Sequence, residues 1–300
     1  MEGFPDISII GPGKVGTALG ALAVRAGLPV VAVAGGAPGK AEAAAEFIGG
    51  QASPCSPAIA AGVGGLVLLT VPDDRIQLVC QELAQEGAFA AGAVVAHCCG
   101  MLSSDILRPA ADCCGCLIGS IHPLQTFPTV QAAVEKLPGT WCFCEGDEEA
   151  VEVLHCLAEA IGTHPVRIDP GGKVLYHAAA VMACNYLVAL LDAAVSLARR
   201  AGVDERRWLE ASGPMLRAAV DNVLGLGPAE ALTGPIARGD VETIRRHAAA
   251  LGAADRGLRR LYAAAGLQTV ELALRKGSLR RPQAAEIRKI LEDLDLRENP

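Results

Sequence analysis

The first half of the chain alternates short apolar runs with segments in which apolar side chains recur every three or four positions. The apolar runs lie at residues 7–10, 30–34, 66–71, 93–97, 116–120 and 141–144. Runs without an internal polar alternation are typical of strands that are covered on both faces. Helical patterns, such as those at residues 41–47 and 75–86, separate several of these runs. The pattern predicts an α/β fold with a doubly wound, Rossmann-type parallel sheet.

The pattern changes near residue 169, after which no convincing strand follows. Long alanine- and leucine-rich helices are predicted over residues 173–201, 204–224, 240–265 and from Gln268, or from after Pro282, to the end. We therefore predict a dinucleotide-binding domain in residues 1–168 and an all-helical substrate or dimerisation domain in residues 169–300. Residues 178–197 are so apolar that we expect them to be buried on most sides or against a second subunit, as in a homodimer.

Three glycines at the end of the first apolar run form the pattern G-x-G-x-x-G. Gly11 permits a tight turn, Gly13 lets the backbone approach a pyrophosphate, and Gly16 lets the following helix pack closely on the strand. Gly27 is placed to end that helix. The expected cofactor-binding residues of this segment are Gly11, Pro12, Gly13, Lys14, Val15 and Gly16. The motif predicts a bound dinucleotide at the helix N-terminus.

The second apolar run indicates which dinucleotide is preferred. NAD-preferring domains carry an acidic residue there that binds the ribose 2′-hydroxyl, but this run ends in Gly35 and Gly36, and the first acid is Glu42, beyond Lys40. An uncharged strand end with a nearby ammonium suits a 2′-phosphate, which favours NADP(H). The alternative for Lys40 is a solvated residue in the first turn of a helix.

A second set of cofactor residues is expected where the third long apolar run ends. The residues at that position are Val71, Pro72 and Asp73. In an open parallel sheet, ligands bind outside the carboxyl ends of the strands.

Composition excludes some function classes. The net charge of −7 argues against a nucleic-acid partner, because phosphate neutralisation needs a basic face. Eleven cysteines without paired C-x-x-C units indicate small buried side chains in a reducing, cytoplasmic compartment rather than a metal site. We expect no signal peptide and no membrane-spanning segment.

Five polar residues are candidates for chemistry. His97 and His122 follow strands, Lys173 and His177 share one face of a helix, and Asn185 lies two turns further on. Lys173 is the first choice as proton donor and His122 the second, because a lysine in a desolvated cleft has a lowered pKa. The alternatives are a histidine bonded to backbone for His97 and a solvated residue for Lys173.

Several segments together resemble those of bacterial Rossmann-like proteins with a C-terminal helical domain of unknown function, which are described as candidate NADP-dependent oxidoreductases. The segments are residues 11–16, 71–76, 97–100, 119–127, 173–185 and 233–240. The likeness covers nearly the whole chain, and it implies this fold and cofactor without implying a substrate.

More distant likenesses suggest residue roles. Residues 173–177 are similar to the K-x-x-N-N segment of β-hydroxyacid dehydrogenases, whose lysine is the general acid or base, with Tyr176 and His177 in place of the asparagines. Residues 119–123 resemble the G-x-H-P segment of prephenate dehydrogenases, whose histidine contacts substrate, with spacing that differs by one residue. The organisation of the chain is also similar to that of pyrroline-carboxylate and ketopantoate reductases.

The function that these features indicate is an NADP(H)-dependent oxidoreductase. Its substrate would be a small carbonyl, imine or hydroxyl compound held between the two domains. The alternative is a nucleotide-binding sensor or partner-binding protein without turnover, which needs only the phosphate cradle. The intact glycine motif argues against a purely structural dimer.

Overall fold

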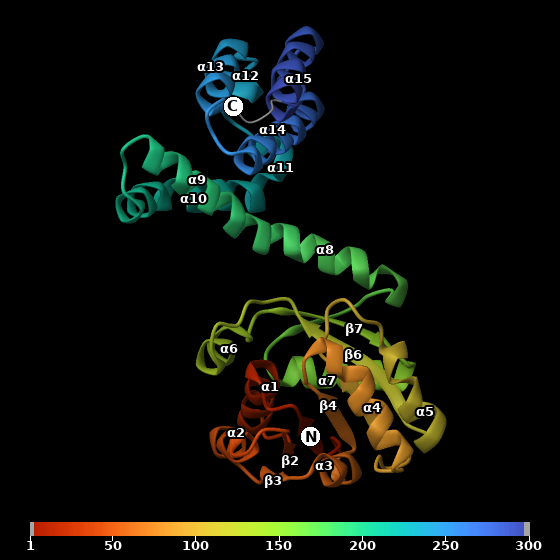
Figure 1. The fold of residues 1–300 in the computed structure, drawn as a ribbon. Helices are drawn as coiled ribbons and strands as arrows, with labels where there is room; N and C mark the ends of the chain where they lie inside the picture. The colour runs from red at the N-terminus through yellow and green to blue at the C-terminus, as the bar shows by residue number, and fades with distance from the viewer. Residues whose placement is uncertain (1–2, 297–300) are drawn as a thin grey trace. The chain divides into compact units, whose positions relative to one another are not determined.

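The computed structural model describes residues 3–296, so the first two and the last four residues of the predicted domains lie outside the described residues. The chain divides into two compact units, Met1–Asn185 and Tyr186–Pro300. The last strand ends at Arg167, and every later element of the described chain is helical (Figure 1). An α/β Rossmann-type unit followed by a helical region is therefore confirmed.

The first unit is built on one eight-stranded sheet in the order β3-β2-β1-β4-β5-β6-β7-β8. Its strands are β1 (Ile7–Ile10), β2 (Val30–Ala34), β3 (Ser53–Cys55), β4 (Leu66–Leu69), β5 (Val94–His97), β6 (Leu117–Pro123), β7 (Trp141–Gly146) and β8 (His164–Arg167). All neighbours are parallel except β6 and β7. The sheet is thus mixed rather than wholly parallel. The apolar pattern did not reveal β3 and β8, because both are short and no residue of either is fully buried.

Helices cover both faces of this sheet. They are α1 (Lys14–Arg25), α2 (Lys40–Ile48), α3 (Pro57–Val63), α4 (Ile76–Gln85), α5 (Arg108–Cys114), α6 (Val130–Lys136) and α7 (Glu148–Ala160), with single 3-10 turns η1 (Asp73–Arg75), η2 (Ser104–Leu107) and η3 (Pro170–Gly172). The last helix of the unit, α8 (Lys173–Ala183), follows β8 and has one buried residue, Lys173. One apolar core lies under α1, α2, α6 and α7, and a second lies under α3, α4 and α5. Alanine side chains fill much of both cores, which lets the helices lie close to the strands.

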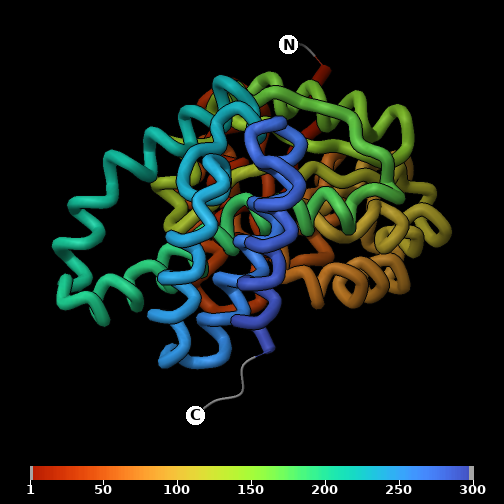
Figure 2. Tube along the Cα trace, turned by 90° about the horizontal axis from the view of Figure 1, so that it is seen from above, coloured from red at the N-terminus to blue at the C-terminus, as the bar shows by residue number. Residues whose placement is uncertain are grey.

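The second unit is a helical bundle. Its helices are α9 (Asn185–Arg200), α10 (Glu205–Leu226), α11 (Pro228–Ala231), α12 (Pro235–Arg238), α13 (Val241–Leu251), α14 (Arg256–Lys276) and α15 (Arg281–Leu296). In Figure 2 α14 and α15 run side by side at the blue end of the chain, around a core that includes Val270 and Leu291. The helix predicted over residues 240–265 is two helices, because Asp255 caps a new one with a hydrogen bond to Leu258 N–H.

The helical stretch from residue 170 to 200 is long and apolar enough, by length and composition alone, to cross a membrane. One such helix does not show a membrane span, so the expectation of no membrane-spanning segment stays a prediction. Burial of residues 178–197 on most sides within the chain was wrong, since Val195 is the one buried residue of that range. Leu175 is 77% exposed and Val188 is 65% exposed.

Candidate functional site

The glycine loop, residues 11–16, joins β1 to α1 at the carboxyl edge of the sheet. Gly11 has φ +100°, and a Cβ there would lie 2.5 Å from the backbone nitrogen of Val71. A Cβ at Gly16 would overlap the hydroxyl of Thr70, which donates a hydrogen bond of 2.7 Å to the carbonyl oxygen of Gly11. The packing of the protein itself therefore requires two of the three glycines.

Gly13 is different, because nothing in the protein crowds it. It is exposed, its φ is −83°, and the nearest heavy atom to a Cβ built there is the carbonyl oxygen of Thr70 at 3.9 Å. No described side chain caps the N-terminus of α1, so the first N–H groups of that helix are free to bind an anion. The loop fits a pyrophosphate that approaches Gly13 from outside.

Two adjoining cavities lie beside the glycine loop. One of about 220 Å³ is lined by Ile10, Gly11, Gly35, Gly36, Pro57, Val71, Pro72, Arg75 and Val79. The other, of about 300 Å³, is lined by Gly35, Gly36, Ala37, Pro38, Gly39, Ala41, Glu42, Pro54 and Cys55. Together they give an apolar crevice and an open strand end of the kind that holds an adenosine.

The predicted cofactor residues fall at different places around these cavities. Gly35 packs on Pro12, since a Cβ there would lie 2.6 Å from the proline Cδ. Lys40 is exposed in the first turn of α2 and does not line either cavity. Asp73 begins η1, while Lys14 and Val15 lie in the first turn of α1.

Sequence reasoning missed Arg75. Its side chain lines the same cavity as Gly36, so it brings a cation to the end of β2. The sequence signal for Arg75 was its position directly after Asp73 and Asp74, close to the carboxyl end of β4.

The imidazole cavity, a hollow of about 390 Å³, brings three of the predicted residues together. It is lined by His122, Leu124, Gln125, Thr126, His177, Ala180, Val181, Ala183, Cys184 and Asn185. Thus β6, α8 and the start of α9 supply two imidazoles and one amide. Lys173 and His97 do not line it.

The ring of His122 is held between a tyrosine and a glycine. Its Nδ1 lies 2.7 Å from the hydroxyl of Tyr176, and a Cβ at Gly100 would lie 2.8 Å from its Nε2. Tyr176 in turn packs on Phe143, with ring centroids 4.4 Å apart. Gly100 also lets His177 approach, because a Cβ there would lie 3.0 Å from that ring.

Burial lowers the pKa of His122 to about 4, and the nearby charge of Lys173 acts in the same direction, as do His177 and His97. Asp73 opposes the shift. Burial also raises the pKa of the Tyr176 hydroxyl. Near neutral pH this pair is therefore a neutral imidazole and a protonated phenol.

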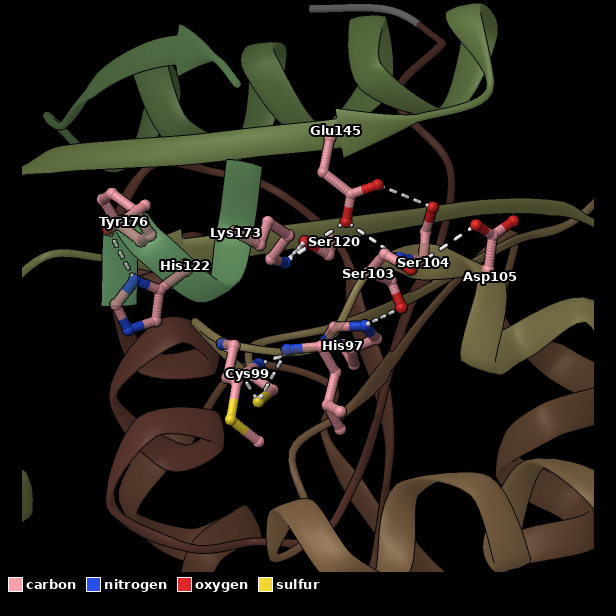
Figure 3. A network of polar contacts seen from close by, with 12 residues as sticks. His97, Cys99, Ser103, Ser104, Asp105, Ser120, His122, Glu145, Lys173 and Tyr176 are labelled. Carbon is pink, nitrogen blue, oxygen red and sulfur yellow. Dashed lines mark hydrogen bonds and ion pairs between the residues drawn. The ribbon is translucent and has the colours of Figure 1, made fainter. Parts of the chain in front are cut away.

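Lys173 lies behind the cavity in a buried polar network (Figure 3). It is 1% exposed, its Nζ donates to the hydroxyl of Ser120, and it lies 3.2 Å from Oε1 of Glu145. Ser104 donates to the same carboxylate from its backbone N–H at 2.9 Å and from its hydroxyl at 2.8 Å. Burial lowers the pKa of Lys173, and Glu145 opposes that shift. The alternative of a solvated lysine is wrong.

Sequence reasoning also missed Glu145. Its signal was a lone acid in the otherwise apolar run at the end of β7. The antiparallel pairing of β6 with β7 sets Glu145 opposite Ser120, so the carboxylate meets the lysine from the neighbouring strand.

His97 ends β5 with both ring nitrogens in use. Nδ1 accepts a hydrogen bond of 3.1 Å from the backbone N–H of Cys99, and Nε2 lies 3.2 Å from the carbonyl oxygen of Ser103 (Figure 3). This pattern assigns the proton to Nε2. Burial lowers the pKa of His97 to about 4. The ring fixes the loop after β5 and leaves no nitrogen free for a ligand.

The cysteines are free thiols. Burial raises the pKa of Cys144 to about 12 and that of Cys80 to about 11, so both remain protonated. Among residues 3–296 no group of three or more histidine, cysteine or acidic side chains is placed to hold a metal ion.

Two family models match successive parts of the chain. Residues 5–123 match the Rossmann-like domain, and residues 140–269 match a domain of unknown function, DUF2520. Each of the two models covers less than half of the chain, and the two matches do not overlap. The second match begins at β7, so the region that matches DUF2520 includes Glu145, Lys173, Tyr176 and His177.

Solved structures share the fold over nearly the full length. A candidate NADP oxidoreductase from Bacteroides fragilis is 22% identical, with a TM-score of 0.70 over 89% of this chain and 98% of that one. A protein from Thermotoga maritima is 24% identical, with a TM-score of 0.64 over 96% and 98%. An imine reductase from Pseudomonas sp. is 18% identical, with a TM-score of 0.57 over 96% and 92%. A search of curated protein sequences found no match.

Proposed function

We propose that this protein is an NADP(H)-dependent oxidoreductase that acts on a small carbonyl, imine or hydroxyl compound. The observation that carries this proposal is the open surroundings of Gly13. The packing of the protein does not require a glycine at this position, whereas the close approach of a pyrophosphate does. Proteins of the same fold include the candidate NADP oxidoreductase and the imine reductase described above, which supports the reaction class.

The cofactor would be held largely by backbone. The free N–H groups of the glycine loop would bind the pyrophosphate, and Gly36 leaves room for the adenosine ribose. Arg75 and Lys40 are the cations on this side that could meet a 2′-phosphate. When bound, NADP(H) supplies or accepts the hydride.

The substrate would lie in the imidazole cavity. His122 is the side chain placed to hydrogen-bond the reacting heteroatom, with His177 and Asn185 on the same wall. Lys173 would act through its neighbours, since its Nζ is engaged with Ser120 and Glu145. The geometry therefore favours His122 over Lys173 as the group that touches substrate.

Substitution of Gly13 by alanine tests the cofactor proposal. We expect the Gly13→Ala variant to bind NADPH at least about tenfold more weakly than the unaltered protein, because a Cβ occupies the place of the pyrophosphate. Its thermal midpoint should be unchanged, since nothing in the protein meets that Cβ. Protein fluorescence measures the binding.

Gly225→Ala is the matched control. Its Cβ meets nothing within 4 Å, that of Gly13 meets nothing closer than 3.9 Å, and Gly225 lies in α10, away from the glycine loop. Unaltered affinity in Gly13→Ala would refute the proposed cofactor position. Screening small carbonyl, imine and hydroxyl compounds for NADPH oxidation or NADP+ reduction then tests turnover.

The second candidate function is a nucleotide-binding sensor without turnover. The observation in its favour is that His97 and Lys173 are both fully engaged in internal hydrogen bonds. NADPH binding without turnover of any screened compound class would support the sensor.

We also propose a homodimer in the reducing environment of the cytoplasm, where eleven free thiols persist. Exposed side chains along residues 174–190 form an apolar face that a second copy would cover. Light scattering should give twice 30.8 kDa. A stable monomer, or binding of the protein to phosphatidylcholine vesicles through this face, would contradict the dimer.

A further inference from the structure

The hydrogen bond between Tyr176 and His122 holds one proton, which is carried either by the tyrosine hydroxyl oxygen or by Nδ1 of the imidazole. If the tyrosine donates to Nδ1, the phenol proton has an acceptor and the imidazole proton is on Nε2. If Nδ1 donates instead, the phenol proton is left without an acceptor, because no other hydrogen bond joins Tyr176 to the described chain. A phenol is a stronger hydrogen-bond donor than a neutral imidazole N–H, and an imidazole nitrogen is a stronger acceptor than a phenol oxygen. Donation from Tyr176 to Nδ1 therefore gives the stronger hydrogen bond, and the first arrangement is the favoured one.

The other nitrogen of His122, Nε2, has no partner within the described chain. It lies beside the carbon of Gly100. The ring is one of the cavity's lining residues. With Nδ1 occupied by Tyr176, Nε2–H is the donor that a ligand would meet.

The rest of the cavity is also suited to an acceptor. Its described lining contains no aspartate, glutamate, lysine or arginine, and its polar side chains come from His122, Gln125, Thr126, His177, Cys184 and Asn185. The Lys173–Glu145 pair lies next to Ser120 on β6, and the charge of Lys173 acts on His122 more strongly than the opposing charge of Asp73. A cation in this hollow would face a donor and would have no carboxylate partner.

We infer that Tyr176 is a positioning residue that holds His122 as a neutral imidazole with its proton on Nε2. The cavity then takes ligands that present an oxygen acceptor, such as a carbonyl or carboxylate group, and rejects ammonium and iminium cations. This inference rests on the proposed function in assigning the cavity to the substrate. Among the proposed substrate classes it selects carbonyl compounds.

Histidine ¹⁵N NMR of the full-length protein tests the tautomer without cofactor or turnover. The chain has six histidines, so single His→Gln variants assign the signals. At pH 7 we expect His122 to show a protonated Nε2 and a hydrogen-bonded, unprotonated Nδ1. His97 serves as an internal reference, because its backbone partners fix the same tautomer.

Tyr176→Phe should convert the His122 signals to a mixture of tautomers. The matched control is Tyr262→Phe, which removes the same contact, 2.8 Å, between a tyrosine hydroxyl and Nδ1 of His247 in the helical unit. That control should leave His122 unchanged. Intact His97 signals in Tyr176→Phe exclude unfolding as the cause. A wild-type His122 with its proton on Nδ1, or an unchanged ring in Tyr176→Phe, overturns the inference.

Ligand selectivity is read from the same signals. Millimolar acetamide and acetate, as carbonyl and carboxylate probes, should shift Nε2 of His122, and methylammonium should not. Tyr176→Phe should weaken both responses severalfold. A methylammonium response equal to that of acetamide overturns the ligand class. Because these measurements need no nucleotide, their failure is distinguishable from failure of NADPH to bind.

Discussion

The glycine loop and the imidazole cavity lie at the same end of one sheet, but they are built in opposite ways. The loop is made of backbone, with two glycines fixed by packing and a third left open to solvent. The cavity is made of side chains from β6 and α8, and it is backed by a buried lysine and glutamate. The glycine loop is therefore sensitive to added side-chain atoms, and the imidazole cavity is sensitive to the loss of the buried charge behind it.

The largest effect expected from this difference is the loss of the buried charge. Lys173→Met leaves Glu145 buried without its cation, so the free energy of unfolding should fall by about 3–5 kcal/mol. Lys173→Met combined with Glu145→Leu should recover only part of this loss, because it removes the unpaired charge but leaves the buried donors of Ser104 without an acceptor. Urea unfolding measures both.

An exposed ion pair provides the control for that measurement. Arg206 and Glu210 are 88% and 64% exposed, so Arg206→Met should change stability by less than about 1 kcal/mol. A Lys173→Met effect as small as that of Arg206→Met would show that the lysine is not held as described.

Adding one carbon to the loop should give the next largest effect. Gly11→Ala places a Cβ 2.5 Å from a backbone nitrogen at φ +100°, so strain and overlap together should cost about 4 kcal/mol. Thermal unfolding measures the loss, with Gly13→Ala as the neighbour that should melt normally. Similar midpoints for the two variants would remove the distinction between packed and open glycines.

Protonation of His97 at acid pH should lower the stability of the folded protein. In the folded protein its pKa is about 4, against an ordinary value of 6.5, so the unfolded chain binds the proton first. Stability should therefore fall as the pH drops from 6.5 to 4, by about 3 kcal/mol, and this term should be constant above and below that window. Urea unfolding across that range tests it, and His97→Asn should lose this part of the slope. An unchanged slope in that variant contradicts the assignment.

The smallest expected effect concerns which dinucleotide the loop side prefers. Arg75→Ala removes the cation beside Gly36, so the Kd for NADPH should rise about tenfold while that for NADH stays constant. Parallel fluorescence titrations measure both. If Arg75→Ala weakened the binding of NADPH and NADH equally, Arg75 would contact the adenine rather than the 2′-phosphate. If Lys40→Ala weakened NADPH binding more than Arg75→Ala did, Lys40 would be the residue that binds the 2′-phosphate.

The two sites also differ in how much the sequence could predict. Gly11, Gly13 and Gly16 act through local backbone geometry, so their spacing alone indicated the turn and the helix N-terminus. The partners of Lys173 are 28 and 53 residues away, and only folding shows that they meet. The direction of β7 was equally hidden, because an apolar run looks the same in a parallel or an antiparallel strand.

His122 and Tyr176 show the limit of motif reasoning most directly. The sequence placed His122 at a strand end and treated Tyr176 as a replacement for an asparagine, but 54 residues separate the two. Their contact depends on the first turn of α8, which Lys173 fixes against the sheet. The sequence could therefore identify His122 as a candidate site residue, but it could not predict that Tyr176 is its hydrogen-bond partner.

The attachment of α8 has a thermodynamic consequence. Its one fully buried residue is a charged lysine, so release of the helix from the sheet would expose an ion pair and little apolar surface. Heat capacity rises with exposed apolar area and falls with exposed polar area, so this release would leave the calorimetric heat capacity nearly constant. Amide hydrogen exchange in residues 173–183 would nevertheless accelerate, which would identify α8 as a separately opening element of the fold.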